Sequence, residues 1–168
     1  MTVLVDVTSG NHESYLDAIV EIERLSFPTP WSRNAFAQEL KNPVSHLWAL
    51  LDGASLSGYM CFWMFDSEIQ LINVAVHPEK RGRGLGRFLM EKMIDAGIVN
   101  GMHQVWLEVR ESNRPAQRLY DHFGFGTVGR RTLYYRDTNE DAIVMSLNLA
   151  NRPEIRKAAN ESQMKSEV

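Results

Sequence analysis

The feature that most constrains the fold is a run of three segments between residues 68 and 109. The stretch EIQLINVAV is strongly β-prone, and a glycine-rich loop follows it. From Gly84 to about Asn100 the apolar residues recur at helical spacing, and HQVWLEV then reads as another strand. A strand–helix–strand unit of this kind is a parallel crossover, so the chain is expected to form a sheet with at least one parallel pair.

Hairpins flank this unit on both sides. SHLWALL and LSGYMCFWMF stand either side of Asp52-Gly53, a strong hairpin signal, and GTVGRRTLYY and DAIVMSLNL stand either side of the polar turn RDTNED. Upstream, TVLVDVT is typical of a strand, and Ser32 can cap a short helix to Leu40. A longer helix is predicted before it, over 12–25, from apolar residues at helical spacing: Tyr15, Ile19, Ile22 and Leu25.

The predicted element order is therefore β α α β β β α β α β β. This order indicates an α/β (α+β) fold, with a mixed, mainly antiparallel sheet of six to seven strands flanked by about four helices. The chain has 168 residues, which suggests one domain, expected over 1–149, followed by a polar C-terminal tail over 150–168.

Composition excludes several classes of function. The net charge of −3 gives no global basic field for nucleic acid, so any cationic site must be local. No apolar run approaches a membrane span, and the N-terminus has no basic region followed by a long apolar run, so neither a membrane anchor nor a signal peptide is expected. Cys61 is the only cysteine, which excludes a disulfide framework and favours the cytoplasm. The five histidines show no metal-ligand spacing, so no metal is expected, and a monomer is the default expectation.

Three glycines and three arginines lie close together in the loop Arg81–Arg87, at the start of the central helix. A helix N-terminus presents free N–H groups and a partial positive charge, glycines allow close backbone approach, and arginines add charge-assisted bonds. These features suit the pyrophosphate of a cofactor. The spacing fits neither a Walker loop nor a dinucleotide fingerprint. The alternative is a solvent-exposed turn that binds no ligand.

Two further residues are candidates for proton transfer. Glu108 lies in QVWLEVR, where it shares a strand face with Trp106, and a carboxylate in such a β-prone strand is uncommon. It can serve as a general base, or it can be an exposed residue paired with a cross-strand Arg or Lys. Tyr120 flanks a helical core stripe of Ala116, Leu119 and Phe123. It can serve as a general acid, or it can be a half-buried packing tyrosine.

The segment INVAVHPEKRGRGLGRFLMEKMI resembles the acyl-CoA-binding motif of the GNAT superfamily of N-acetyltransferases. The Q/R-x-x-G-x-G/A core of that motif falls on Arg81, Gly84 and Gly86, and the likeness covers roughly Val3 to Leu149. The segments FPTPWSRNAF, VWLEVRESNRPAQRLYDHFGF, and RRTLYY followed by EDAIVMSL resemble one branch, the bacterial ribosomal-protein-alanine N-acetyltransferases. Thr29 departs from that branch, because it interrupts a segment that is often FPW.

The resemblance implies the site and the ligand. It implies acetyl-CoA as cosubstrate, with Glu108 as general base and Tyr120 as general acid. The residues implied to bind acetyl-CoA are Val74, Ala75, Val76, Arg81, Gly82, Arg83, Gly84, Leu85, Gly86, Arg87, Asn113 and Tyr120. Those implied to border the acceptor are Pro30, Trp31, Tyr134 and Tyr135, although either tyrosine can be a plain strand aromatic.

The implied function is direct transfer of an acetyl group to the N-terminal α-amine of a protein, expected to be the N-terminal alanine of a small-subunit ribosomal protein. An α-amine has a pKa of about 7.7–8.0 against about 10.4 for lysine, so it needs only a modest base. The alternatives are an acetyltransferase acting on lysine, a polyamine or another small amine, and a non-catalytic acyl-CoA-binding module. No direct nucleic-acid or membrane partner is expected.

Overall fold

The structure is a computed structural model that describes residues 1–150. The predicted C-terminal tail lies outside the described residues, apart from Ala150. The strands are β1 (Thr2–Asp6), β2 (Ser45–Asp52), β3 (Ser55–Phe65), β4 (Glu68–Val76), β5 (Gln104–Arg110), β6 (Gly126–Tyr135) and β7 (Glu140–Asn148). The helices are α1 (Leu16–Ser26), α2 (Arg33–Glu39), α3 (Leu85–Val99) and α4 (Arg114–His122), with short 3-10 turns η1 (His12–Ser14) and η2 (Pro78–Lys80).

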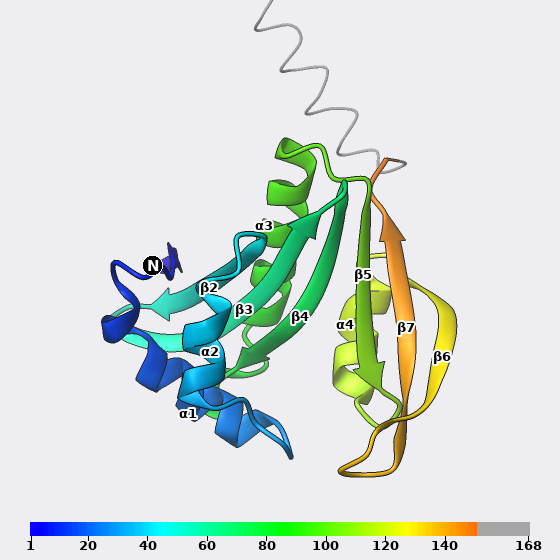
Figure 1. The fold of residues 1–168 in the computed structure, drawn as a ribbon, viewed down its shortest axis with the longest axis horizontal. Coiled ribbons are helices and arrows are strands. Elements are labelled where there is room, and N and C mark those ends of the chain that lie inside the picture. Colours follow the sequence, from blue (N-terminus) through cyan, green and yellow to red (C-terminus); the bar gives the residue numbers. More distant parts are fainter. Residues whose placement is uncertain (151–168) are drawn as a thin grey trace, which may run out of the picture.

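The seven strands form one sheet in the order β1-β2-β3-β4-β5-β7-β6 (Figure 1). Among the strands of residues 1–150, only β4 and β5 pair in parallel, and the other neighbours are antiparallel. The predicted α/β class, the element order and the mainly antiparallel sheet are therefore confirmed. Within residues 1–150, no helix is both long enough and apolar enough to cross a bilayer.

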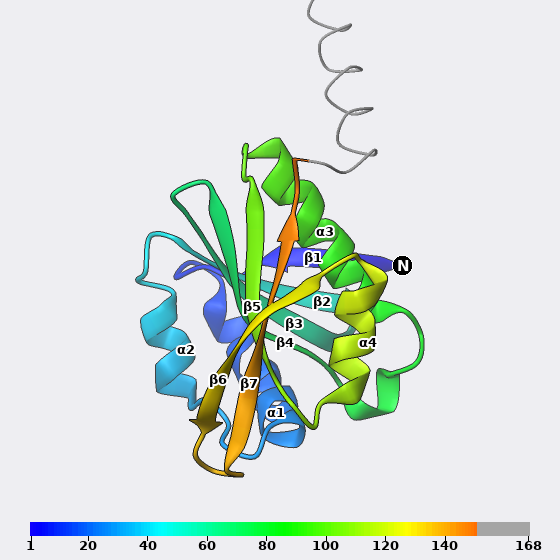
Figure 2. The same cartoon turned by 90° about the vertical axis from the view of Figure 1, so that its right-hand side faces the viewer.

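The helices cover the two faces of the sheet in pairs. Figure 2 shows α1 and α2 on one side and α3 and α4 on the other. The α1/α2 face buries Leu16, Ile19 and Phe36 against Ala49, Tyr59 and Cys61, and a larger core lies beneath α3 and α4. Cys61 is fully buried, as its apolar surroundings predict. The sheet therefore separates two cores.

Local sequence signals set most of the helix ends. The Ser32 hydroxyl accepts a hydrogen bond from Ala35 N at 3.1 Å, so it caps α2 as predicted. Gly124 ends α4 with a φ of 89°, a left-handed conformation that favours glycine. One prediction was wrong: the helix expected from His12 begins as η1, and α1 starts at Leu16. Leu25, one of the apolar residues that predict this helix, is 43% exposed, whereas Leu16 is buried.

A β-bulge in β4 positions the functional region. Cys61 pairs with Asn73 and Phe62 pairs with Leu71, so Ile72 has no partner on β3. Ile72 and Asn73 therefore both face α1 and α2, where Ile72 packs on the core and Asn73 donates to the buried Glu23. A bulge bends its strand and increases the local twist. Beyond this bend the strand leans away from its parallel neighbour.

The β4–β5 ladder is correspondingly short. It pairs residues 68–70 with 104–106 and stops at Gln70 and Trp106, although β4 continues to Val76 and β5 to Arg110. In Figure 1 the two strands separate toward their C-terminal ends. The facing edges beyond Gln70 therefore carry backbone groups that this ladder does not pair.

Candidate active site

The loop predicted to hold phosphate lies between η2 and α3. Gly82 and Gly84 have φ values of 78° and 81°, and an added Cβ at either would meet no atom within 4 Å. The first i→i−4 bond of α3 runs from Phe88 N–H to the Gly84 carbonyl at 3.0 Å. The N–H groups of Leu85 and its next two neighbours therefore have no intrahelical acceptor. The loop has the open backbone that the sequence predicts.

The arginine side chains of this loop differ in role. Arg81 Nε donates to the Val76 carbonyl at 3.0 Å and its Nη2 donates to Ser26 Oγ at 3.1 Å, so this guanidinium braces the loop against β4 and α1. Arg87 Nη2 lies 3.0 Å from His122 Nδ1 on α4. Arg83 is exposed. An anion would therefore meet mainly the backbone N–H groups of this loop. Arg83 is the arginine best placed to contact it, because Arg81 and Arg87 contact other side chains.

The loop is also packed against α4. An added Cβ at Gly86 would lie 3.5 Å from Leu119 Cδ2 and 4.0 Å from Val76 Cγ2, so glycine allows α3 to start close to both α4 and β4. Asn113, predicted to border the cosubstrate, caps α4 by accepting from Ala116 N at 3.3 Å. Val74, Ala75 and Val76 lie on the part of β4 beyond the β4–β5 ladder. The predicted cosubstrate residues are thus gathered at one end of the diverging strands.

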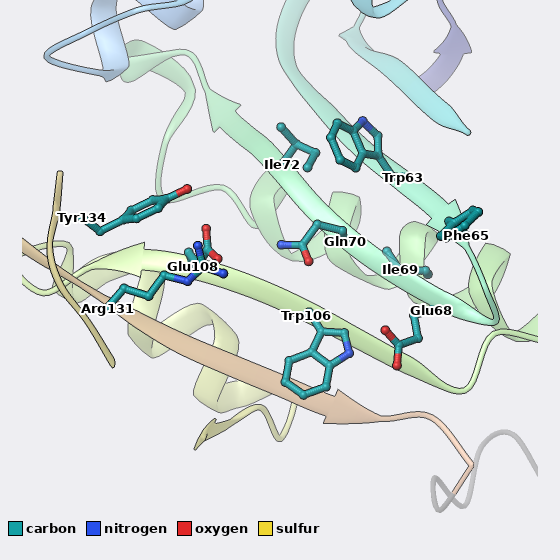
Figure 3. A pocket seen from close by; sticks show the side chains of 10 residues that line it. All are labelled: Trp63, Phe65, Glu68, Ile69, Gln70, Ile72, Trp106, Glu108, Arg131 and Tyr134. Atoms are coloured by element: carbon teal, nitrogen blue, oxygen red, sulfur yellow. Dashed lines mark ion pairs between the residues drawn. The ribbon is translucent and has the colours of Figure 1, made fainter. Parts of the chain in front are cut away.

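A pocket of about 430 Å³ lies over β3, β4 and β5, on the α1/α2 face of the sheet. Figure 3 shows it running from Glu108 and Tyr134 at one end to Glu68 and Phe65 at the other. Its lining residues are Trp63, Phe65, Glu68, Ile69, Gln70, Ile72, Trp106, Glu108, Arg131 and Tyr134. It combines aromatic walls with a few polar groups, which is typical of a binding site.

Glu108 stands at the end of this pocket that adjoins the diverging strands. Its Oε1 lies 3.3 Å from Arg131 Nε, and the two side chains are 21% and 57% exposed. Arg131 comes from β6, which lies beyond β7 from β5. Glu108 therefore pairs with an arginine, as one interpretation expects, and also lines a pocket, and its role as a general base stays a prediction. Sequence analysis did not single out Arg131, since nothing local places β6 beside Glu108.

The two tyrosines at the end of β6 lie near this carboxylate. Tyr134 lines the pocket, and burial with the charge of Glu108 raises its pKa. The Arg131 guanidinium lies 5.3 Å from the Tyr134 ring centroid. Tyr135 does not line the pocket, and burial raises its pKa to about 12. The prediction that both tyrosines border the acceptor stays a prediction, and the structure brings one of them into the pocket.

Tyr120 lies on the other side of the sheet, in the α3/α4 core. It is 5% exposed and its ring centroid is 5.7 Å from that of Phe125. The predicted core stripe of Ala116, Leu119 and Phe123 packs on this core, and Tyr120, which the sequence places beside the stripe, is buried in the same core and not half-exposed. Burial, and then the nearby Tyr135, raise its pKa. Tyr135 is thus within electrostatic reach of both Tyr120 and Glu108.

The α1–α2 loop carries the other predicted acceptor residues. Pro30 is exposed, and the Trp31 ring packs 5.3 Å from that of Phe36, so neither lines the pocket. Trp31 N donates to Glu23 Oε1 at 3.0 Å. Glu23 is 1% exposed, also accepts from the Tyr59 hydroxyl, and has its pKa raised by burial. Sequence analysis missed Glu23, although a carboxylate directly after the core residue Ile22 was a weak signal.

The pocket floor also contains a buried polar atom without a partner. Trp106 Nε1 has no hydrogen-bond acceptor within the described part of the chain. Trp63 Nε1, by contrast, donates to Glu39 of α2. Alternation along β5 predicts that Trp106 shares a face with Glu108, and the structure confirms it. Among residues 1–150, no three His, Cys, Asp or Glu side chains are grouped so that they could hold a metal ion.

Comparisons with known proteins identify similar sequences. Residues 16–125 match the acetyltransferase (GNAT) family. The Escherichia coli (strain K12) ribosomal protein bS18-alanine N-acetyltransferase is 34% identical over 137 residues, which cover 80% of this chain and 92% of that protein. A Bacillus subtilis (strain 168) protein, provisionally named for the same activity, is 38% identical over 77% of this chain and 87% of its own length.

Solved structures show the same fold. The crystal structure of the Escherichia coli ribosomal-protein-S18-alanine N-acetyltransferase matches with a TM-score of 0.80 and 32% identity, covering 89% of this chain and 94% of that one. Arabidopsis thaliana NAA60, solved in complex with acetyl-CoA, matches with a TM-score of 0.75 at 19% identity, covering 90% of this chain and 100% of that one. At that identity the likeness shows the fold alone.

Proposed function

Because the chain belongs to the GNAT acetyltransferase family, we propose that it transfers the acetyl group of acetyl-CoA to the N-terminal α-amine of a protein. The observation that carries this proposal is the position of Glu108, in a pocket that adjoins the diverging ends of β4 and β5. The names of its relatives point to one acceptor class, the N-terminal alanine of a small-subunit ribosomal protein.

The chain's own residues fit acetyl-CoA. The N–H groups of the Arg81–Arg87 loop suit a pyrophosphate, because Gly82 and Gly84 are left-handed and an added Cβ at either would meet nothing within 4 Å, which leaves room for a close ligand. The edge of β4 near Val74 and Val76 lies beyond the β4–β5 ladder and suits the amide groups of the pantetheine arm, as an added strand would, with the Val76 carbonyl already bound by Arg81 Nε. When bound there, acetyl-CoA supplies the acetyl group and a thiolate leaving group.

Glu108 is the proposed general base. Its ion pair with Arg131 fixes the carboxylate at the end of the pocket, where it can take a proton from the attacking amine directly or through a water. About a tenth of N-terminal amines are neutral at pH 7, against roughly one lysine in 2,500. A carboxylate is therefore an adequate base for an α-amine and a poor one for lysine.

Tyr120 is the proposed general acid. The amine nitrogen bonds to the acetyl carbon, the carbon–sulfur bond breaks, and the Tyr120 hydroxyl gives its proton to the departing sulfur. Burial raises the pKa of this phenol, so it stays protonated throughout the neutral range. Glu108 and Tyr120 lie on opposite faces of the sheet, on either side of the diverging strands β4 and β5. The acceptor is therefore proposed to approach from the face of Glu108, and Tyr120 acts from the other face.

The acceptor is proposed to enter on the α1/α2 face. Tyr134 lines the pocket beside Glu108, and the loop that carries Pro30 and Trp31 lies at the C-terminal end of α1 on the same face. The net charge of −3 offers no broad attraction to nucleic acid, so no direct nucleic-acid partner is proposed. We propose that the protein acts as a monomer in the cytoplasm, without contact with a membrane.

A peptide pair tests this proposal. One peptide begins with a free alanine and contains one lysine, and the other has the same sequence with its N-terminus blocked. We expect acetyl-CoA-dependent mass gain on the free peptide alone, placed at the α-amine by fragmentation. Acetylation of the blocked peptide at a comparable rate would favour a lysine acceptor, and no turnover of either, with acetyl-CoA bound, would favour a binding module.

A further inference from the structure

A hydrogen bond joins the two loops on the acceptor side. Thr29 Oγ1 donates to Asp137 Oδ2 at 2.8 Å, across 108 positions of sequence. Thr29 lies in the α1–α2 loop, and Asp137 lies in the turn between β6 and β7. Figures 1 and 2 both place these two loops side by side. Thr29 is the residue that interrupts the segment often found as FPW in the similar branch, so this hydrogen bond is made by a residue at which the sequence differs from that branch.

Asp137 is held firmly from its own side. Arg110, at the end of β5, donates to its two oxygens at 2.7 and 2.8 Å, and Thr138 N donates to Oδ1 at 2.8 Å. The bonds from Arg110 and then Thr29 hold the pKa of this carboxyl well below its usual range. The Arg110 guanidinium also stacks 4.1 Å from the centroid of the Tyr135 ring. The hydroxyl of Thr29 therefore meets a fixed anion.

The α1–α2 loop is also held from the other side. Trp31 N donates to Glu23, and Asn73 of β4 reaches the same carboxylate at 3.5 Å. The loop that carries Thr29 is thus linked to β4 through Glu23 and Asn73. Asp137 is linked to β5 through Arg110. These are the two strands whose ladder stops at Gln70 and Trp106. The bond therefore spans the diverging part of the sheet on its acceptor side.

We propose that the Thr29–Asp137 hydrogen bond is a clasp that sets the width of the acceptor entrance, which makes Thr29 a positioning residue for the acceptor. This inference rests on the proposed function. With the clasp closed, the entrance admits the narrow end of an extended chain and is already shaped before that end binds. When the Thr29–Asp137 bond is broken, the α1–α2 loop and the β6–β7 turn can separate. Binding of the acceptor must then also order these two loops, which lowers its affinity.

Substitution at Thr29 tests the clasp. Thr29→Val keeps the shape and removes the donor, whereas Thr29→Ser keeps the donor. A hydrogen bond to a charged group on a partly exposed loop is worth about a five- to tenfold change in an equilibrium. We expect Thr29→Val to raise the KM for the alanine peptide about fivefold, with kcat and the Kd for acetyl-CoA within about twofold of wild type. Thr29→Ser should restore the wild-type KM.

Hydrogen exchange gives a readout that does not depend on the acceptor. Backbone amides of residues 134–139 should exchange about fivefold faster in Thr29→Val than in wild type, and Thr29→Ser should match wild type. If wild type acetylates neither peptide, the proposed function fails, and this exchange difference alone decides the clasp. If wild type is active and Thr29→Val changes neither the KM nor the exchange rates, the clasp is overturned while the proposed function stands.

Discussion

Replacing Gly84 by alanine tests whether the loop at the start of α3 binds the pyrophosphate of acetyl-CoA. Gly84 is the N-cap residue of α3 and has a φ of 81°. Its missing side chain would point into open space, because an added Cβ would meet nothing within 4 Å. A loss of affinity in this variant would therefore come from the ligand side and not from a clash inside the protein.

Two separable effects are expected. A left-handed conformation costs a residue with a side chain about 1–2 kcal/mol, and restriction of the unfolded chain returns about 0.4–1 kcal/mol, so the free energy of unfolding should fall by roughly 1 kcal/mol. A methyl group at this position keeps phosphate away from the adjacent N–H groups. Loss of one charge-assisted bond worth about 1.5–3 kcal/mol weakens binding roughly 10- to 100-fold.

Gly53 provides a matched control. It has a φ of 69°, an added Cβ there also meets nothing within 4 Å, and it lies in the β2–β3 turn. Gly53→Ala should lose the same stability in urea unfolding and keep the wild-type Kd for acetyl-CoA in titration calorimetry. If Gly84→Ala binds acetyl-CoA as tightly as Gly53→Ala does, the loop is an exposed turn and the assignment of the phosphate site is wrong.

Three further predictions concern buried groups. Tyr120→Phe keeps the contact with Phe125 and should lower kcat about 100-fold without changing the Kd for acetyl-CoA; equal turnover would remove Tyr120 from the mechanism. Burial raises the pKa of Glu23 above its unfolded value, so its contribution to stability is full at low pH and declines as pH rises through the folded pKa. Glu23→Gln should therefore gain stability relative to wild type between pH 4 and pH 8 in urea unfolding, and a constant difference would contradict this sign. Burial raises the pKa of Cys61 to about 12, so a thiol reagent should label it only after denaturation, and rapid labelling of the native protein would refute its burial.

The parts of the fold that short-range chemistry decides could be predicted from the sequence. The strand 68–76 was predicted with its observed bounds, and the turn predicted at Asp52-Gly53 lies one residue later, between Asp52 and Ser55. The β propensity of the strand and the glycine of the turn both act within a few residues. The face shared by Trp106 and Glu108 followed from simple alternation, since β5 has no bulge in its pairing with β7.

The parts that depend on distant contacts could not be predicted. The bulge at Ile72 shifts every later side chain of β4 to the other face, and no local residue marks it. The pairing of Glu108 with Arg131 requires the strand order β5-β7-β6, which the sequence does not reveal. The burial of Glu23 depends on hydrogen bonds from Tyr59, which is distant in sequence, and from the backbone of the α1–α2 loop. A charged residue that would ordinarily be expected at the surface is therefore buried.

The most direct test of the account compares Glu108→Gln with Glu111→Gln in turnover of the alanine-initiated peptide. Both glutamates pair with arginines of β6, but only Glu108 lines the pocket. We predict that Glu108→Gln binds acetyl-CoA normally and loses about 100-fold in kcat at pH 7, with a smaller deficit above the pKa of the acceptor amine. Glu111→Gln should keep wild-type turnover. Equal turnover by both variants at pH 7 would contradict the assignment of Glu108 as the base.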